Sequence, residues 1–253
     1  MIKSYSQQDI GQWAYFSGDY NQVHFDRAIA HKNGLADIIV QGMLVMMAAK
    51  LKLADQIKGD SRLNFYLKQP VYLDEPVQYQ YGEKNQYFFN KIIKTSSVQE
   101  AITAKLSNQQ SPIFATPAHK IAISADFFQT QSTLFRQTYP QIQSNWLLMD
   151  ALLFSVCFKY QHGEPYYQKA LKITSQPDKS KVVTYQTDQK IYIPARLLSD
   201  REIDVSKLSA YFEDKDIIQQ DDSVYSLLDY QVMEGDQLLY QSSMGSITKA
   251  QLD

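Results

Sequence analysis

The stretch over residues 42–57, GMLVMMAAKLKLADQI, limits the folds open to this chain more than any other part of the sequence. Its apolar side chains do not follow one helical stripe but surround the helix axis until Lys50 and Lys52 appear. A helix that is apolar on all sides is normally buried. We therefore predict a helix that begins at Gly42 and is wrapped by other elements of the chain.

The residues after this helix can form the strands that wrap it. They form runs rich in tyrosine, phenylalanine, valine and isoleucine, separated by short polar breaks, which is typical of antiparallel strands. The runs cover residues 63–73, 76–81, 87–95 and 98–106. One buried helix followed by a meander of strands indicates an α+β fold, with the sheet wrapped around the long apolar helix.

The same order of elements recurs in the second half of the chain. A short helix over residues 127–135 precedes a second apolar helix, WLLMDALLFSVCF, over residues 146–158. The later strand-like runs cover residues 166–174, 181–193, 208–212, 224–233 and 238–247, with a hairpin turn at residues 234–236. A polar segment with two prolines separates the halves. We predict domains over residues 1–110 and 119–253, joined by a linker over residues 111–118.

The residues with the clearest chemical potential lie before the first apolar helix. Ser6 and Asp9 are spaced almost as in a capping box, which predicts an amphipathic helix over residues 7–16. After that helix, Asp19 and His24 are five residues apart, so both side chains can point to one side of a turn. A carboxylate and an imidazole together suit acid–base chemistry. The same pattern also fits an Asx turn at Asp19 and a surface histidine.

Gly42 adds a third candidate group. The start of a helix presents unpaired backbone N–H groups and the positive end of the helix dipole, and a glycine there lets a ligand oxygen approach closely. A close contact between helix and strand explains the same glycine. In company with Asp19 and His24, it suggests a site that polarises a carbonyl and moves a proton beside it.

Composition excludes several classes of function. The 25 basic and 27 acidic residues nearly cancel, and no basic run stands out, so nucleic acid is not an expected partner. Cys157 is the only cysteine, which excludes an internal disulfide and offers no metal-ligand cluster. The N-terminus lacks the apolar core of a signal peptide, and the most apolar stretch is too short to span a bilayer. We expect a soluble cytoplasmic protein without a metal or cofactor.

Three segments together closely resemble the MaoC-like, R-specific enoyl-CoA hydratases. They are SGDYNQVHFDRA, the later QGMLV at the head of the apolar helix, and SRLNFYLKQPVYLDEPV. The family motif reads roughly S-G-D-x-N-P-x-H-x-D, then H-G-M, then F-x-x-P-V-x-x-G-D-x-V. The matching residues are Ser17, Gly18, Asp19, Asn21, His24, Asp26, Gly42, Met43, Phe65, Pro70, Val71 and Val77. The resemblance covers approximately residues 5–106.

The resemblance implies the hotdog fold and a reaction. Asp19 and His24 would hold and activate a water that adds to C3 of a trans-2-enoyl thioester, or would run the dehydration of a 3-hydroxyacyl thioester in reverse. The backbone N–H of Gly42 would bind the thioester oxygen, with Gln41 and Asn21 also in the substrate-binding set. The partner would be an acyl thioester of coenzyme A or of acyl carrier protein, and no cofactor is implied.

The sequence departs from the family motif at three places. Gln22 replaces the usual proline, Gln41 replaces the usual histidine before the helix glycine, and Asp74-Glu75 replaces a Gly-Asp turn. None of these changes touches Asp19, His24 or Gly42. They bear on activity because Gln22 neighbours the turn that aims His24 and Gln41 replaces a supporting imidazole.

The second half lacks the acid–base pair. His119 and His162 are its only histidines, and neither follows an aspartate by five residues. His162 is expected in a solvent-facing turn. Asp150 lies inside the second apolar helix, where it is either buried with a partner or on the solvent-exposed side of the helix. By resemblance, the chain is a double hotdog whose C-terminal half is degenerate.

Two other functions remain open at this stage. One is a non-catalytic hotdog protein that binds an acyl thioester or serves as a subunit of a larger assembly. The other is a hotdog thioesterase, for which Asp37 is the candidate carboxylate near the central helix. The oligomeric state is also open, because one chain can already contain two hotdogs and a homodimer can still form through edge strands.

Overall fold

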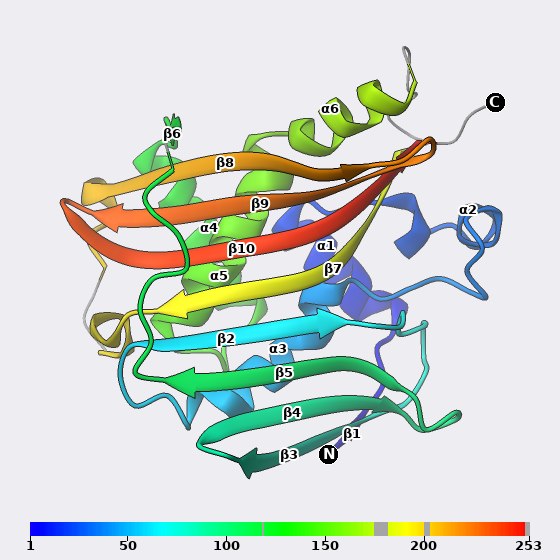
Figure 1. Cartoon of the computed structure of the whole chain (residues 1–253), viewed down its shortest axis with the longest axis horizontal. Coiled ribbons are helices and arrows are strands. Elements are labelled where there is room, and N and C mark those ends of the chain that lie inside the picture. Colours follow the sequence, from blue (N-terminus) through cyan, green and yellow to red (C-terminus); the bar gives the residue numbers. More distant parts are fainter. Residues whose placement is uncertain (118, 175–181, 200–202, 251–253) are drawn as a thin grey trace.

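The computed structural model describes residues 1–117, 119–174, 182–199 and 203–250. The first half contributes strands β1 (Ile2–Lys3), β2 (Ser61–Leu67), β3 (Val77–Lys84), β4 (Tyr87–Lys94) and β5 (Glu100–Asn108). The second contributes β6 (His119–Ile121), β7 (Val182–Ile193), β8 (Leu208–Gln219), β9 (Ser223–Glu234) and β10 (Gln237–Ala250). Figure 1 shows that these strands form one large twisted sheet, with helices gathered on one of its faces. The α+β class is confirmed.

The helices fall into two sets, and each set lies between the short first strand of its half and the four strands that follow. The first set is α1 (Gln7–Ser17), the 3₁₀ turn η1 (Gln22–His24), α2 (Arg27–Lys32) and α3 (Gly42–Ala54). The second set is α4 (Ala125–Thr138), α5 (Asn145–Ser155), the π-helical turn η2 (Val156–Tyr160) and α6 (Glu164–Ile173). Two 3₁₀ turns, η4 (Ala195–Leu198) and η5 (Val205–Lys207), lie between β7 and β8. No described helix is long and apolar enough to cross a bilayer.

The two halves of the sheet have the same strand order. Counted from the centre outward, it is β2-β5-β4-β3-β1 in the first half and β7-β10-β9-β8-β6 in the second. Every neighbouring pair among these strands is antiparallel. The halves meet where β2 pairs with β7, and Phe65 there lies opposite Gln189. The chain therefore uses one topology twice, joined along a central pair of strands (Figure 1).

Each half packs an apolar helix against its part of the sheet. Helix α3 begins at Gly42, as predicted, and most of its side chains are buried. In α5 every residue after Asn145 is buried. The predicted polar residue inside α5, Asp150, is buried with a partner, because its Oδ2 lies 2.6 Å from the Nζ atom of Lys50 in α3.

Helix α1 follows the sequence pattern closely. The Ser6 hydroxyl accepts from the backbone of Asp9, and the Asp9 carboxylate accepts from the backbone of Ser6, so the predicted capping box is present. Gly18 ends the helix in the left-handed conformation, with φ of 83°. That conformation is open to glycine at no steric cost. The chain thus turns sharply just before Asp19.

The prediction of a strand over residues 166–174 is wrong, because these residues belong mostly to α6. Gly163 precedes the helix, Pro165 stands in its first turn, and Glu164 adds a favourable charge there. These are signals of a helix start. Tyr166, Lys169 and Ala170 are buried at helical spacing. The tyrosines had suggested a strand, but the spacing of the buried residues is that of an amphipathic helix.

Two further predictions need correction in their bounds. The strand predicted over residues 63–73 ends at Leu67, and residues 68–73 form a loop that contains Pro70. Proline lacks the N–H that continues a ladder. The strand predicted over residues 208–212 is much longer, because β8 continues to Gln219 beside β9.

The segment predicted as a linker crosses the face of the sheet away from the helices (Figure 1). Gln241 of β10 donates to the carbonyl of Phe114 at 2.8 Å and accepts from the N–H of Ile113 at 2.9 Å. Arg62 of β2 donates to the carbonyl of Ser111 at 2.7 Å. The described part of this segment is therefore hydrogen-bonded to strands of both halves.

Candidate active site

A cavity lies beside the start of α3, where the two halves meet. From the first half it is lined by Asp19, Asn21, His24, Leu35, Ile39, Val40, Gly42, Val45, Leu67, Lys68, Gln69, Pro70, Val71 and Ile102. From the second half it is lined by Phe154, Phe158, Tyr166, Thr184, Tyr185, Gln186, Thr187 and Met244. Polar groups gather near the helix start, whereas most other lining side chains are apolar. Such a cavity suits a ligand with one polar reactive end and an apolar remainder.

Asp19 is held at the cavity wall by the turn that follows α1. Its backbone N–H donates to the Ser17 hydroxyl at 3.1 Å, and its Oδ1 accepts from the N–H of Asn21 at 3.3 Å. The second bond is the Asx turn expected at this position. The residue is 5 % exposed. Burial raises the pKa of the Asp19 carboxyl above its ordinary value, and the nearby His24 and the Asn21 N–H oppose that rise.

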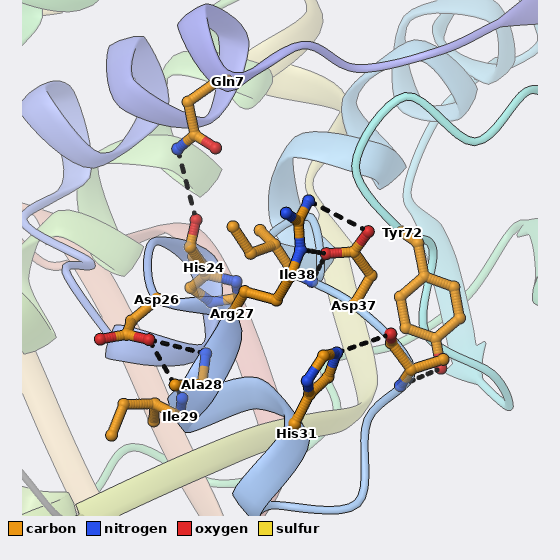
Figure 2. Close-up of polar contacts among 11 residues, drawn as sticks. Gln7, His24, Asp26, Arg27, Ala28, Ile29, His31, Asp37, Ile38 and Tyr72 are labelled. Atoms are coloured by element: carbon orange, nitrogen blue, oxygen red, sulfur yellow. Dashed lines mark hydrogen bonds and ion pairs between the residues drawn. The ribbon is translucent and has the colours of Figure 1, made fainter.

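His24 is held from both its backbone and its ring. Figure 2 shows the Gln7 side chain pointing at the His24 carbonyl, which accepts its N–H at 3.5 Å. The ring Nδ1 lies 2.7 Å from the carbonyl oxygen of Ile39. The residue is 5 % exposed, so the expectation of a surface histidine does not hold. The backbone carbonyl and the ring of His24 are therefore both held by hydrogen bonds within the protein.

Contacts within the segment after His24 hold Ile39, whose carbonyl oxygen is the partner of the His24 ring. Asp26 caps α2 by accepting from the N–H groups of Ala28 and Ile29 (Figure 2). Arg27 reaches across to Asp37, with Nε 2.7 Å from Oδ1. These contacts tie α2 to the strand-like stretch that ends at Ile39.

The two acid–base groups face each other without a direct hydrogen bond. The Nε2 atom of His24 lies 3.7 Å from the Oδ2 atom of Asp19. A carbonyl can only accept, so the bond to Ile39 places the ring proton on Nδ1 and leaves Nε2 with a lone pair in the neutral imidazole. In that tautomer Nε2 of His24 and the Asp19 carboxylate are two neighbouring acceptors at the cavity wall. A water molecule, which has two O–H donors, matches that pair.

Gly42, at the start of α3, lines the same cavity as Asp19 and His24. A Cβ atom at this position would lie 2.6 Å from Cδ2 of Leu67 and 3.1 Å from Oε1 of Gln186. The first N–H groups of a helix have no partner within the helix. The glycine therefore allows the start of α3 to pack closely against Leu67 of β2 and Gln186 of β7, and Gly42 itself lines the cavity.

The other predicted site residues divide between the cavity and its surroundings. Asn21 lines the cavity and donates to the carbonyl of Thr184 in β7 at 3.0 Å. Gln41 is buried, but its amide turns to the carbonyl of Ile10 in α1, and the residue is not among those that line the cavity. Asp37 pairs with Arg27 near the surface and also lies outside the lining. His119 and His162 are exposed.

Several lining residues come from the second half and were missed in the sequence. Tyr166 was assigned to a strand, although the Gly-Glu-Pro helix start before it is a readable signal. Gln186 and Phe158 carry no signal of their own, because their place in the cavity depends on how the halves pair. Among the described residues, no group of three or more histidine, cysteine or carboxylate side chains is placed to hold a metal ion.

Comparison with known proteins gives a consistent picture. Residues 3–105 match the model of the MaoC like domain. Among solved structures, a MaoC-like dehydratase superposes with a TM-score of 0.52 at 9 % identity, over 96 % of this chain and 94 % of that one. A MaoC domain protein dehydratase from Chloroflexus aurantiacus J-10-fl superposes with a TM-score of 0.51 at 8 % identity, over 100 % of this chain and 94 % of that one. No curated protein matches the sequence.

The two superpositions extend over nearly the whole chain, so they show that the fold of both halves is shared. The family match covers the part of the chain that contributes Asp19, Asn21, His24 and Gly42 to the cavity. Residues 3–105 are therefore similar in sequence to the MaoC like domain, and the chain as a whole shares the fold of the two solved structures.

Proposed function

We propose that the protein is an enoyl-thioester hydratase or, in the other direction, a 3-hydroxyacyl-thioester dehydratase. The observation that carries the proposal is the placement of Asp19 and His24, 3.7 Å apart, on the wall of a cavity that also contains the start of α3. The similar fold of two proteins described as MaoC-like dehydratases supports the same reaction class. The substrate is a trans-2-enoyl group bound as a thioester to coenzyme A or acyl carrier protein.

In this mechanism the buried pair holds one water between two acceptors. As the water oxygen bonds to C3, one of its protons passes to the Asp19–His24 pair, and the C2–C3 π electrons move toward the thioester oxygen. The backbone N–H of Gly42 donates to that oxygen while it gains enolate character. The Asp19–His24 pair then delivers the proton that it took from the water to C2, which restores the carbonyl and the pair, so the reaction adds one water in total.

The proposal includes the architecture. Residues 1–110 form one hotdog unit, residues 111–118 form the connection, and residues 119–253 form a second hotdog without an acid–base pair. The repeated strand order and the buried helix of each half support this division. The second unit widens the cavity by adding α5, α6 and β7 to its wall.

The activity test is loss of the conjugated enoyl absorbance of crotonyl-CoA and of a longer enoyl-CoA. We expect Asp19→Asn and His24→Ala each to lower kcat by about 10²-fold or more, the range typical of a lost general acid or base. Asp55→Asn and His119→Ala are matched controls, because both side chains are exposed. The two controls should leave the rate unchanged.

Near-normal turnover in either site variant would refute the assigned roles. Release of free thiol from saturated and unsaturated acyl-CoA alike would instead identify a thioesterase. Binding of acyl-CoA without either reaction would favour a non-catalytic acyl-thioester protein.

A further inference from the structure

Gln186 stands out among the cavity residues of the second half because of where its amide lies. Its Oε1 is 3.1 Å from the point that a Cβ of Gly42 would occupy. It lines the same cavity as Asp19 and His24. The terminal amide of a β7 side chain is thus adjacent to the first backbone amides of α3, although the two elements belong to different halves of the chain.

A β-bulge sets this position. Along the β7–β10 ladder, Gly245 lies opposite Asp188 but the next residue, Ser246, lies opposite Gln186, so Thr187 has no opposing residue. Gly245 leaves room here for the Asp188 carboxylate, since a Cβ at this position would lie 2.0 Å from its Oδ2 atom. Bulges are frequent next to active sites, where they redirect side chains. The bulge lies directly after Gln186 in the strand.

Within the described part of the chain, the Gln186 amide has no strong partner. Its Nε2 donates to the sulfur of Met43 at 3.7 Å. A thioether is a weak acceptor. A more basic oxygen that entered the cavity beside Gly42 would be a better acceptor for this N–H. Because Oε1 is the amide atom nearer to Gly42, the terminal amide must turn about its last C–C bond to direct the N–H there.

We propose that Gln186 is a second hydrogen-bond donor to the thioester oxygen, acting beside the backbone N–H of Gly42. This inference rests on the proposed function. It makes the second half a contributor to catalysis, although that half lacks an acid–base pair. Two donors on one oxygen stabilise the enolate more than they stabilise the neutral thioester, so the effect of Gln186 belongs to kcat more than to KM.

The test compares wild type, Gln186→Met and Gln186→Glu in hydration of crotonyl-CoA. Methionine keeps the length of the side chain but cannot donate, and glutamate, when ionised, replaces the donor by an acceptor. We expect Gln186→Met to lower kcat by about 10²-fold, as for loss of one oxyanion donor, with KM changed by only a few-fold. Gln186→Glu should lose more, because its charge repels the enolate.

A second readout separates hydrogen bonding from packing. Butyryl-CoA labelled with ¹³C at the thioester carbonyl cannot be hydrated, and infrared difference spectra report the stretching frequency of its bound C=O group. A donor polarises the carbonyl and lowers that frequency, so the frequency should rise in Gln186→Met. Gln80→Met, the same change at an exposed glutamine of β3, should leave both kcat and the frequency unchanged.

The outcomes are separable. An active wild type with unchanged kcat in Gln186→Met would overturn this inference and leave the proposed function standing. A lower kcat with an unchanged carbonyl frequency would also overturn it, because the side chain would then act through packing alone. A wild type that hydrates no enoyl thioester would overturn the proposed function and this inference together.

Discussion

At the scale of single residues, the carboxylate of Asp19 is held in an unfavourable environment that its proposed role can explain. Burial raises its pKa from 3.8, while the unfolded chain returns it to the ordinary value. The folded protein therefore binds this proton more tightly than the unfolded chain does. Above the raised pKa the ionised carboxylate lowers folding stability, and the loss disappears as the pH falls through the raised pKa toward 3.8.

We predict that Asp19→Asn is more stable than wild type at neutral pH, although it is inactive. Asparagine has the same shape, keeps an acceptor for the Asn21 N–H, and can donate to Nε2 of His24. The free energy of unfolding should increase, because the substitution removes a carboxylate charge that burial disfavours. Urea unfolding at several pH values measures it, and the gain should shrink as the medium becomes acidic. Equal stability at every pH would contradict the linkage.

The sequence could identify the residues of the site that are close together in the chain. Asp19, Asn21 and His24 lie within one turn, so a short motif carries their geometry, and all three line the cavity. Gln186 and Tyr166 depend on pairing between distant strands and helices, which no local pattern encodes. Gln41 shows the opposite case. It stands where the motif has a histidine, but its side chain turns toward α1 and not toward the cavity.

At the scale of elements, the contact between the end of α1 and η2 links the two halves beside Asp19. A Cβ atom on Gly18 would lie 2.7 Å from Cγ of Lys159, 3.2 Å from its backbone nitrogen and 3.2 Å from Cβ of Phe158. The first of these atoms belongs to a flexible side chain, but the other two are fixed by the π-helical turn. Gly18 is therefore required both for its backbone conformation and for space.

We predict that Gly18→Ala destabilises the protein more than Gly163→Ala does. Both glycines have positive φ, 83° and 68°, but no atom lies within 4 Å of a Cβ at Gly163. The left-handed backbone alone costs about 1–2 kcal/mol for alanine. Crowding against η2 should add a similar amount at Gly18 and displace Asp19, so kcat should fall as well. Guanidinium unfolding and enoyl-CoA turnover measure the two effects, and equal losses for both variants would show that the contact with η2 is unimportant.

Elements were predictable where one local signal dominated. The capping box of α1, the glycine that begins α3 and the turn between β9 and β10 all appear where the sequence places them. The segment of α6 was misassigned because its tyrosines favour strands, whereas its packing against β9 and β10 uses helical spacing. Propensity is a weak guide where tertiary packing decides.

At the scale of the whole molecule, the halves are joined by a buried polar network as well as by the β2–β7 pair. The Lys50 ammonium group lies 2.6 Å from Oδ2 of Asp150 and 2.7 Å from Oε1 of Gln189. The other oxygen of Asp150 accepts from Gln189 and from Tyr240, each at 2.7 Å. Burial lowers the pKa of Lys50, and the charge of Asp150 opposes that shift. The sequence shows only a lysine and an aspartate inside two apolar helices; their pairing follows from the architecture.

We predict that Lys50→Met and Asp150→Leu each destabilise the protein strongly, by about 3–5 kcal/mol, because each leaves an unpaired charge in the core. The double variant removes both charges and should recover much of that loss, as buried ion pairs often can be replaced by apolar groups. Recovery should be incomplete, since Tyr240 and Gln189 lose the acceptor that Asp150 supplies. Urea unfolding of the wild type and the three variants gives the coupling energy directly.

The sign of the coupling energy between Lys50 and Asp150 shows whether the pair contributes to the association of the two halves. Burying a lysine in one apolar helix is unfavourable unless the other helix supplies a carboxylate to pair with it. The pair therefore favours association of the two different halves over association of two like halves. Lys52→Met, at a lysine that pairs with Asp55 in solvent, is the control and should change stability little. Additive losses in the double variant would mean that Lys50 and Asp150 are tolerated independently, and the pairing of the halves would then rest on the central strands and apolar packing alone.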